Sequence, residues 1–174
     1  MSVPHDTSTQ PIWRAMTEAD LDGVVEVAQL SFPDHPEDLA CFANRLALNP
    51  SGCFALAGDD GKVVGYLVAY PWQRYAAPAL NTQIEAPPVQ TEGIYLHDLA
   101  IHPDLRGGGY TRPVVEALAA QSLAAGYNRL TLVAVNNASG FWERNGFRVM
   151  NPEGMAAKLA SYGDDARYME RELA

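Results

Sequence analysis

The segment from residue 101 to 113, IHPDLRGGGYTRP, limits the possible folds of this chain more than any other. It lies between an apolar run typical of a β-strand and a segment with the apolar spacing of a helix. Three successive glycines let the backbone bend so that several N–H groups point into one concavity, and the helix start adds its partial positive charge there. Arg106 and Arg112 flank the bend. The segment therefore predicts a strand, a loop and a helix that together hold an anion such as a phosphate.

The glycine loop differs from two common nucleotide-binding loops. It lacks the Gly-Lys-Ser/Thr ending of nucleotide-triphosphate loops and the Gly-x-Gly-x-x-Gly fingerprint of dinucleotide-binding domains. Pro113 lies in the first helical turn, where its missing N–H costs least, so the amides of residues 107–111 remain as donors. A bare triple glycine is more often a flexible turn, but the flanking strand, arginines and helix favour an anion site here.

Strand-like runs and amphipathic segments follow one another along the rest of the chain. Strands are expected at residues 12–15, 53–57, 63–70, 94–101, 130–135 and 167–173. Helices are expected at residues 18–30, 37–48, 112–125 and 139–145. Residues 58–62, GDDGK, supply the turn of an antiparallel hairpin. We find no repeat or linker, so a single α/β domain is expected over residues 12–174, after a flexible polar tail at residues 1–11.

Composition excludes several classes of protein. The formal net charge of −9, with 12 Lys plus Arg against 21 Asp plus Glu, opposes an extended nucleic-acid surface. No apolar run approaches the roughly 20 residues of a membrane span. Cys41 and Cys53 are too few for a disulfide framework, and no Cys-x-x-Cys or His-x-x-x-His spacing indicates a metal site, so no metal and a reducing cytoplasm are expected. The acidic charge can attract a cationic substrate or simply maintain solubility, and by itself it names no ligand.

Residues 71–92 form an unusually long connection between two expected strands. It contains four prolines together with Trp72, Arg74 and Tyr75. Long loops of this kind either carry function or are mobile. Both interpretations stay open: a lid or pocket wall, and a floppy insertion.

The motifs around the glycine loop resemble the GCN5-related N-acetyltransferase (GNAT) superfamily. Its acyl-CoA motif is Arg/Gln-x-x-Gly-x-Gly/Ala, placed after a strand that ends in a hydrophobic-Ala-hydrophobic triplet. Here the triplet is Leu99-Ala100-Ile101, and the loop is Arg106-Gly107-Gly108-Gly109-Tyr110-Thr111. Thr111 departs from the family pattern, although its hydroxyl can itself bond a phosphate oxygen.

A second family motif follows at the expected distance. Residues 135–147, VNNASGFWERNGF, are similar to the Asn-containing strand end and the Tyr-x-x-x-Gly-Phe helix of the superfamily. Trp142 stands where many relatives have a tyrosine that protonates the departing thiolate of CoA, and an indole cannot serve as that acid. We expect Trp142 to pack beside the pantetheine arm, in the core, or both. Either Asn136 or Asn137, with Asn137 favoured, is expected to bond the pantetheine, the alternative being a turn that caps the helix.

The resemblance implies a GNAT-type fold, with a mixed, mostly antiparallel sheet and flanking helices. It implies acetyl-CoA as cosubstrate and direct attack by a primary amine in a ternary complex. It also implies the residues that bind the cosubstrate, which are Leu99, Ala100, Ile101, Arg106, Gly107, Gly108, Gly109, Tyr110, Thr111, Asn137 and Trp142.

The candidate catalytic residues are His97 and Asp98, on the strand before the loop. Some polyamine-type relatives have Tyr-Leu-Glu-Asp at residues 95–98, so His97 falls where a glutamate acts as a base, directly or through water. Strict alternation along a strand places His97 and Asp98 on opposite faces of the sheet. The alternatives are a structural histidine hydrogen-bonded in the sheet and an aspartate that is its structural partner.

The acceptor cannot be identified from the sequence, because its pocket is expected to come from residues 31–36 and 71–92, which carry no diagnostic pattern. Small-molecule and peptide amines both remain candidates. Two other functions stay open: a noncatalytic acyl-CoA-binding or regulatory domain, and transfer of a larger acyl group. A homodimer is expected only by analogy with the family.

Overall fold

The computed structural model describes residues 10–173, and its centre is one seven-stranded sheet in the order β1-β2-β3-β4-β5-β7-β6. The strands are β1 (Ile12–Ala15), β2 (Cys53–Ala57), β3 (Val63–Trp72), β4 (Gly93–Ile101), β5 (Arg129–Ala134), β6 (Arg148–Val149) and β7 (Arg167–Glu172). Neighbouring strands are antiparallel except β4 and β5, which are parallel. The predicted mixed, mostly antiparallel sheet is confirmed. Most of the tail expected at residues 1–11 lies outside the described residues.

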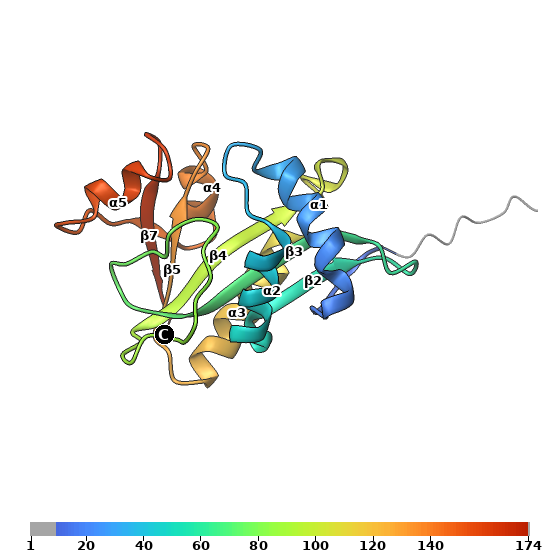
Figure 1. Cartoon of the computed structure of the whole chain (residues 1–174), viewed down its shortest axis with the longest axis horizontal. Helices are drawn as coiled ribbons and strands as arrows, with labels where there is room; N and C mark the ends of the chain where they lie inside the picture. The colour runs from blue at the N-terminus through green and yellow to red at the C-terminus, as the bar shows by residue number, and fades with distance from the viewer. Residues whose placement is uncertain (1–9, 174) are drawn as a thin grey trace, which may run out of the picture.

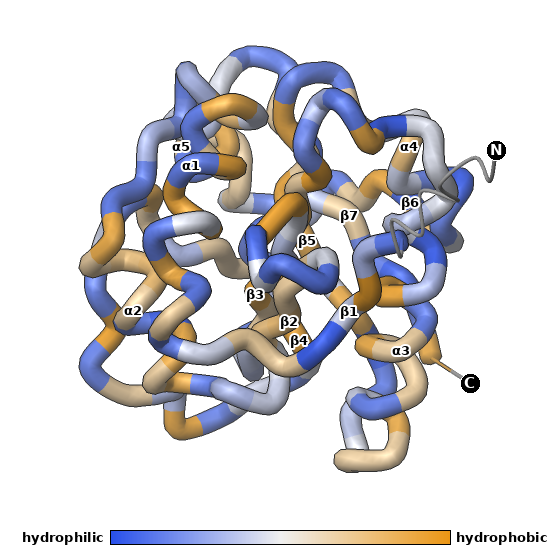
Figure 2. The backbone as a smooth tube through the Cα atoms, turned by 90° about the vertical axis from the view of Figure 1, so that its right-hand side faces the viewer, coloured by the Kyte–Doolittle hydropathy of each residue, from blue (hydrophilic) through white to orange (hydrophobic). Residues whose placement is uncertain are grey.

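Helices cover both faces of the sheet (Figure 1). They are α1 (Leu21–Ser31), α2 (Leu39–Leu48), α3 (Thr111–Ala124), α4 (Ser139–Arg144) and α5 (Ala156–Ala160). In the view of Figure 2, α1 and α2 lie on one side of the strands and α3 on the other. Among the described residues, no helix combines the length and the apolar character needed to cross a membrane.

The core consists of two layers, one on each face of the sheet. On one face, Val24 of α1 and Phe42 of α2 pack with Tyr66 and Tyr70 of β3. On the other face, residues of α3 pack with Leu67 and further residues of β3, β4, β5 and β7. Because both faces of β3 are buried, this strand is apolar throughout instead of alternating with polar residues.

The observed elements follow the predicted ones with local differences. The helix expected at 18–30 begins as a 3₁₀ turn (Glu18–Asp20) before α1. The helix expected at 37–48 begins at Leu39, because the Asp38 carboxylate accepts the N–H of Cys41 (3.1 Å) and caps α2. This cap leaves Glu37 ahead of the helix. The sequence analysis missed β6 and α5, which are short and contain no fully buried residue.

Two irregularities of β4 shape the centre of the sheet. Val68 of β3 pairs with Asp98, but Ala69 pairs with Leu96, so His97 is an extra residue that forms a β-bulge. On its other side, β4 pairs with β5 only at Ile94 and Tyr95. Beyond Tyr95 the two strands separate, as Figure 1 shows. The end of β4 therefore has a free edge toward β5, with backbone groups available to a ligand.

Candidate functional site

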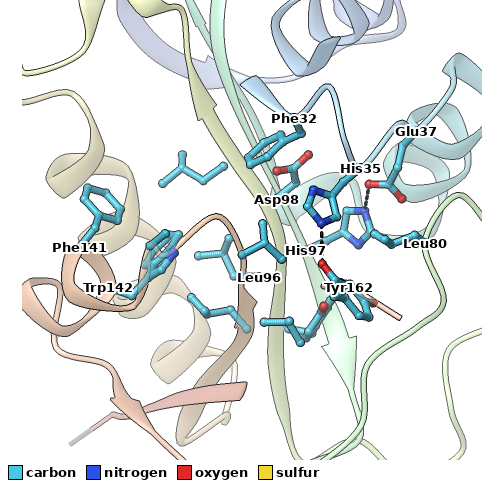
Figure 3. A pocket seen from close by; sticks show the side chains of 16 residues that line it. Phe32, His35, Glu37, Leu80, Leu96, His97, Asp98, Phe141, Trp142 and Tyr162 are labelled. Atoms are coloured by element: carbon cyan, nitrogen blue, oxygen red, sulfur yellow. Dashed lines mark hydrogen bonds and ion pairs between the residues drawn. The ribbon is translucent and has the colours of Figure 1, made fainter. Parts of the chain in front are cut away.

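A pocket of about 170 Å³ occupies the opening between β4 and β5. Phe141 and Trp142 of α4 lie on one side of it, and Glu37, His97 and Asp98 lie on the other (Figure 3). Further walls come from β5, from the loop before β4 and from the segment after α5. The pocket is thus built where β4 loses its neighbour.

The glycine loop begins where β4 ends and leads directly into α3. Gly107 and Gly109 have φ values of +82° and +80°, a left-handed conformation that favours glycine. The Gly108 N–H is used within the loop, since it donates to the carbonyl of Leu105 (3.2 Å). The N–H groups of residues 107, 109, 110 and 111 have no acceptor within residues 10–173. The loop therefore offers unpaired main-chain donors at the start of a helix at four of the five predicted positions, the exception being Gly108.

Contacts from distant parts of the chain hold this loop in place. Trp13 of β1 donates its indole Nε1–H to the carbonyl of Tyr110 (2.8 Å). Arg106 lies 3.4 Å from both the Ile101 carbonyl and the hydroxyl of Ser31 on α1. Trp13 lies almost a hundred residues from Tyr110, and no sequence pattern pointed to it.

The expectation that His97 and Asp98 point to opposite faces of the sheet is wrong. The hydroxyl of Tyr70 contacts His97, and the hydroxyl of Tyr66 donates to Asp98. Tyr66 and Tyr70 lie on the same face of β3, the face that α1 and α2 cover. The bulge at His97 is the physical reason, because an extra residue shifts the alternation by one position. Two successive polar side chains consequently share one side of the strand.

Both ring nitrogens of His97 are hydrogen-bonded. Nδ1 lies 2.9 Å from the hydroxyl of Tyr70, and Nε2 lies 2.7 Å from Oε1 of Glu37. The side chain of His97 is only 2% exposed. Because an ionised carboxylate can only accept a hydrogen bond, Nε2 carries a proton. In the neutral imidazole, Nδ1 then accepts from Tyr70, and no ring lone pair is free for a ligand.

Glu37 is a site residue that the sequence analysis missed. Its Oε2 accepts the N–H of Asn81 (3.0 Å) and the thiol of Cys41 (3.2 Å). Burial raises the pKa of Glu37, but the hydrogen bond and charge of His97, together with the Asn81 N–H, outweigh burial and lower it to about 2. Glu37 is therefore ionised at neutral pH. Nothing local in the sequence indicates its pairing with a strand 60 residues away.

Asp98 has the opposite electrostatic environment. Burial raises its pKa to about 7, although the charge of His97 and the hydroxyl of Tyr66 act to lower it. The carboxyl group can therefore gain or lose a proton near neutral pH. Within the described chain, no lysine or arginine lines the pocket beside it.

Trp142 belongs both to the core and to the pocket wall. Its ring packs edge-to-face against Phe141 (centroids 5.1 Å apart) and Phe147 (5.4 Å), in the layer beneath α3. The same indole lines the pocket. The hydroxyl of Tyr162, another lining residue, is already used, since it donates to the carbonyl of Pro78.

The remaining predicted residues are placed differently. Leu99 lines the pocket, whereas Ala100 is buried in the layer beneath α1 and α2. Asn136 and Asn137 have φ values of +55° and +59° and form a turn. Asn137 is exposed and donates its N–H to Asp165 (2.8 Å), and it is not among the residues that line the pocket.

The long connection between β3 and β4 is tied to the rest of the protein at several points. Arg74 makes two hydrogen bonds to Glu170 of β7 (2.7 and 2.9 Å). Asn44 of α2 exchanges two hydrogen bonds of 2.9 Å with the backbone of Ile84. Leu80 lines the pocket. Of the two interpretations, the geometry supports a pocket wall.

Residues 15–147 match the acetyltransferase (GNAT) family, and the chain belongs to this family. No curated protein matches the chain. Three solved structures share its fold. Ard1 from Thermoplasma volcanium is 17% identical, with a TM-score of 0.73 over 95% of this chain and 99% of that one. The GphF GNAT-like decarboxylase in complex with isobutyryl-CoA is 18% identical, with a TM-score of 0.75 over 94% of this chain and 100% of that one.

The third is the GNAT family N-acetyltransferase YhbS from Escherichia coli, in complex with CoA. It is 17% identical, with a TM-score of 0.61 over 97% of this chain and 84% of that one. The family match places the chain among the acetyltransferases of the GNAT family, and these solved structures share its fold.

Proposed function

We propose that this protein is an N-acetyltransferase that moves the acetyl group of acetyl-CoA to a primary amine, by direct attack in a ternary complex. One observation carries the proposal. The N–H groups of residues 107, 109, 110 and 111 are unpaired within the described residues, and they lie at the end of the strand that lines the pocket. Such donors at a helix start suit a diphosphate, and the pocket suits a thioester and an amine.

We expect acetyl-CoA to bind along the glycine loop and the free edge of β4. The loop amides hold the diphosphate, Arg106 and Arg112 add positive charge, and the Thr111 hydroxyl provides a further donor. The free edge of β4 from Leu96 to Ile101 bonds the pantetheine amides. Trp142 packs against the pantetheine arm from the other side of the pocket.

The acceptor amine needs a base. An amine with a pKa near that of lysine is mostly protonated at pH 7, and its deprotonation costs roughly 4.6 kcal/mol. We assign the proton-accepting role to Asp98, which lines the pocket, and a positioning role to His97, whose two nitrogens are already bonded. Glu37 and Tyr70 hold the side chain of His97, and thereby the β-bulge that His97 forms next to Asp98.

The reaction then balances without a tyrosine acid. Asp98 first accepts a proton from the ammonium form of the acceptor and passes it to water; the neutral nitrogen then attacks the thioester carbon, and Asp98 takes the second proton that the nitrogen loses. The C–S bond breaks, and the thiolate leaves with the bond electrons. A thiol has a pKa of about 8.5, so the thiolate is a good leaving group, and the proton on Asp98 or one from water neutralises it. Trp142 contributes packing and no proton.

Two further expectations fit this proposal. Cys41 and Cys53 are both free thiols, which supports a cytoplasmic location. The acid-lined pocket favours an amine over an anionic acceptor. We propose a small-molecule or peptide amine as the acceptor class and a single domain over residues 12–174 as the functional unit.

The test combines binding with turnover. Calorimetry measures binding of acetyl-CoA, and thiol release is followed over a panel of small amines and peptides. Binding together with amine-dependent thiol release supports the proposal. Binding without turnover on any amine identifies a noncatalytic acyl-CoA-binding domain instead. Faster turnover of propionyl- or butyryl-CoA than of acetyl-CoA identifies a transferase of larger acyl groups.

A further inference from the structure

Three side chains with different metal-binding atoms meet behind the pocket wall. Glu37 precedes α2, Cys41 lies in its first turn, and His97 comes from the bulge of β4. Their ligand atoms, a carboxylate oxygen, Sγ and an imidazole nitrogen, all lie within 4.8 Å of one another. Oε1 of Glu37 is 2.7 Å from Nε2 of His97, and Oε2 is 3.2 Å from Sγ of Cys41.

We propose that Glu37, Cys41 and His97 bind a divalent cation of the zinc type. Zinc prefers a thiolate, an imidazole and a carboxylate at 2.0–2.3 Å, and sites with three protein ligands keep a fourth position open. Ligand atoms that already lie within 4.8 Å need only small side-chain movements to reach such a geometry. Glu37 and His97 also line the pocket (Figure 3), so the cluster lies directly behind the pocket wall.

The proton balance of binding is simple. The cation displaces the proton of the Cys41 thiol, which is released to solvent. The proton on Nε2 of His97 moves to Nδ1, where the hydroxyl oxygen of Tyr70 accepts it at 2.9 Å. Nε2 then offers its lone pair to the metal. No redox change or further reactant is needed.

The surroundings of the cluster resemble the outer shell of metal sites. Ligating histidines usually donate their second N–H to an oxygen, and Tyr70 is placed to accept it. The N–H of Asn81 fixes the Glu37 carboxylate at 3.0 Å. The cluster is also closed to solvent, since Cys41 is 1% exposed and the His97 side chain 2%. The ligands are therefore preordered.

The charges near the cluster favour a divalent cation. With Cys41 as thiolate, Glu37 and Cys41 contribute two negative charges, and Asp98 lies next to His97 in sequence. The opposing charge is Arg45, which is fully buried one turn after Cys41 and lies over the Tyr70 ring at 5.3 Å. A bound divalent cation offsets the two ligand charges and, because only one proton leaves, adds one net positive charge beside Arg45, which the Asp98 carboxylate balances when it is ionised.

Cobalt titration tests the site directly. The full chain is stripped with a chelator, without acyl-CoA, and Co²⁺ is added while the near-ultraviolet thiolate-to-cobalt absorption is recorded. We expect this absorption to saturate at one Co²⁺ per chain and to vanish when Zn²⁺ is added. An unchanged near-ultraviolet spectrum in the parent protein overturns the proposal, whatever the variants do.

Variants identify the ligands. Cys41→Ser is expected to abolish the absorption, and Glu37→Gln to weaken Co²⁺ binding about tenfold or more. Cys53→Ser is the matched control, because Cys53 is equally buried and outside the cluster, and it should titrate like the parent. Loss of the absorption in Cys53→Ser but not in Cys41→Ser would place the metal elsewhere. The measurement involves no acetyl transfer, so its outcome is independent of the proposed enzymatic function.

Discussion

Nε2 of His97 lies 2.7 Å from Oε1 of Glu37, and this hydrogen bond joins β4 to the segment that leads into α2. The two side chains are only 2% and 6% exposed, so loss of either one leaves a buried polar atom of the other without its partner. The pair therefore fixes one wall of the pocket and also contributes to the stability of the fold.

Glu37→Ala is expected to lower the free energy of unfolding by about 3 kcal/mol, because it leaves His97 and the Asn81 N–H without their carboxylate. Urea unfolding at pH 7 measures the change. Glu26→Ala on the exposed side of α1 serves as the control and should change little. Equal stability of the two variants would show that the pair contributes nothing to folding.

Gly109→Ala should weaken acetyl-CoA binding about tenfold, because a Cβ atom would enter the open space in front of the loop and strain its left-handed backbone. Gly61→Ala separates the two effects. Gly61 has a similar φ of +76°, and an added Cβ meets nothing within 4 Å at either position. Both variants should lose about 1 kcal/mol of stability. Only Gly109→Ala should show weaker binding by calorimetry, and equal affinities would remove the loop from the binding site.

Asp98→Asn should reduce kcat about 100-fold or more, because the amide cannot accept the proton of the acceptor amine. Calorimetry should give an unchanged affinity for acetyl-CoA. Asp104→Asn, in the exposed turn after β4, is the control and should keep full activity. Retention of kcat in Asp98→Asn would assign the base to another group.

The pair between Arg74 and Glu170 should make stability depend on acid pH. Burial raises the pKa of Glu170, but the hydrogen bonds and charge of Arg74 outweigh this and lower it below its ordinary value of 4.5. The contribution of Glu170 to the free energy of unfolding is therefore full above about pH 4.5. It is lost as the pH falls through the lowered pKa that Glu170 has in the folded protein. Glu170→Gln should cost about 2 kcal/mol at pH 7 and much less near pH 3.

Urea unfolding of both proteins between pH 3 and pH 7 measures this convergence. Glu172→Gln on the same strand is the control, because Glu172 is exposed and its arginine partner lies 3.5 Å away. A Glu170→Gln deficit that stays constant with pH would contradict the assignment.

Trp142→Tyr should leave kcat nearly unchanged near neutral pH, because the thiolate leaves without an acid and amine attack limits the rate. Steady-state thiol release measures kcat over a range of pH. A large increase would show that the missing tyrosine acid limits this enzyme.

The sequence predicted those parts of the molecule whose causes are local. Strand and helix periods place most elements within two residues of their observed bounds, and four of the five expected loop amides, all but that of Gly108, are unpaired within the described residues. The orientation of His97 and Asp98 could not be predicted, because a bulge depends on the register of two paired strands. Glu37 was missed for a similar reason, since its partners come from β4 and from the loop at Asn81.

Metal chemistry illustrates the same limit. Sequence motifs for metal sites consist of ligands at short regular spacings, whereas Glu37 and Cys41 meet His97 only in the folded chain. Asn137 matches a family position, and its N–H donates to Asp165 in a turn, so its bond to the pantetheine stays a prediction.

The donors of the glycine loop belong to the main chain, and this affects how the protein can diverge. Side chains there can be exchanged widely while the amides keep their directions, provided that Gly107 and Gly109 keep their left-handed conformation. Binding by such a loop depends on the conformation of the main chain more than on the identity of its side chains. A neighbour only 17% identical over 95% of this chain can therefore keep the same architecture.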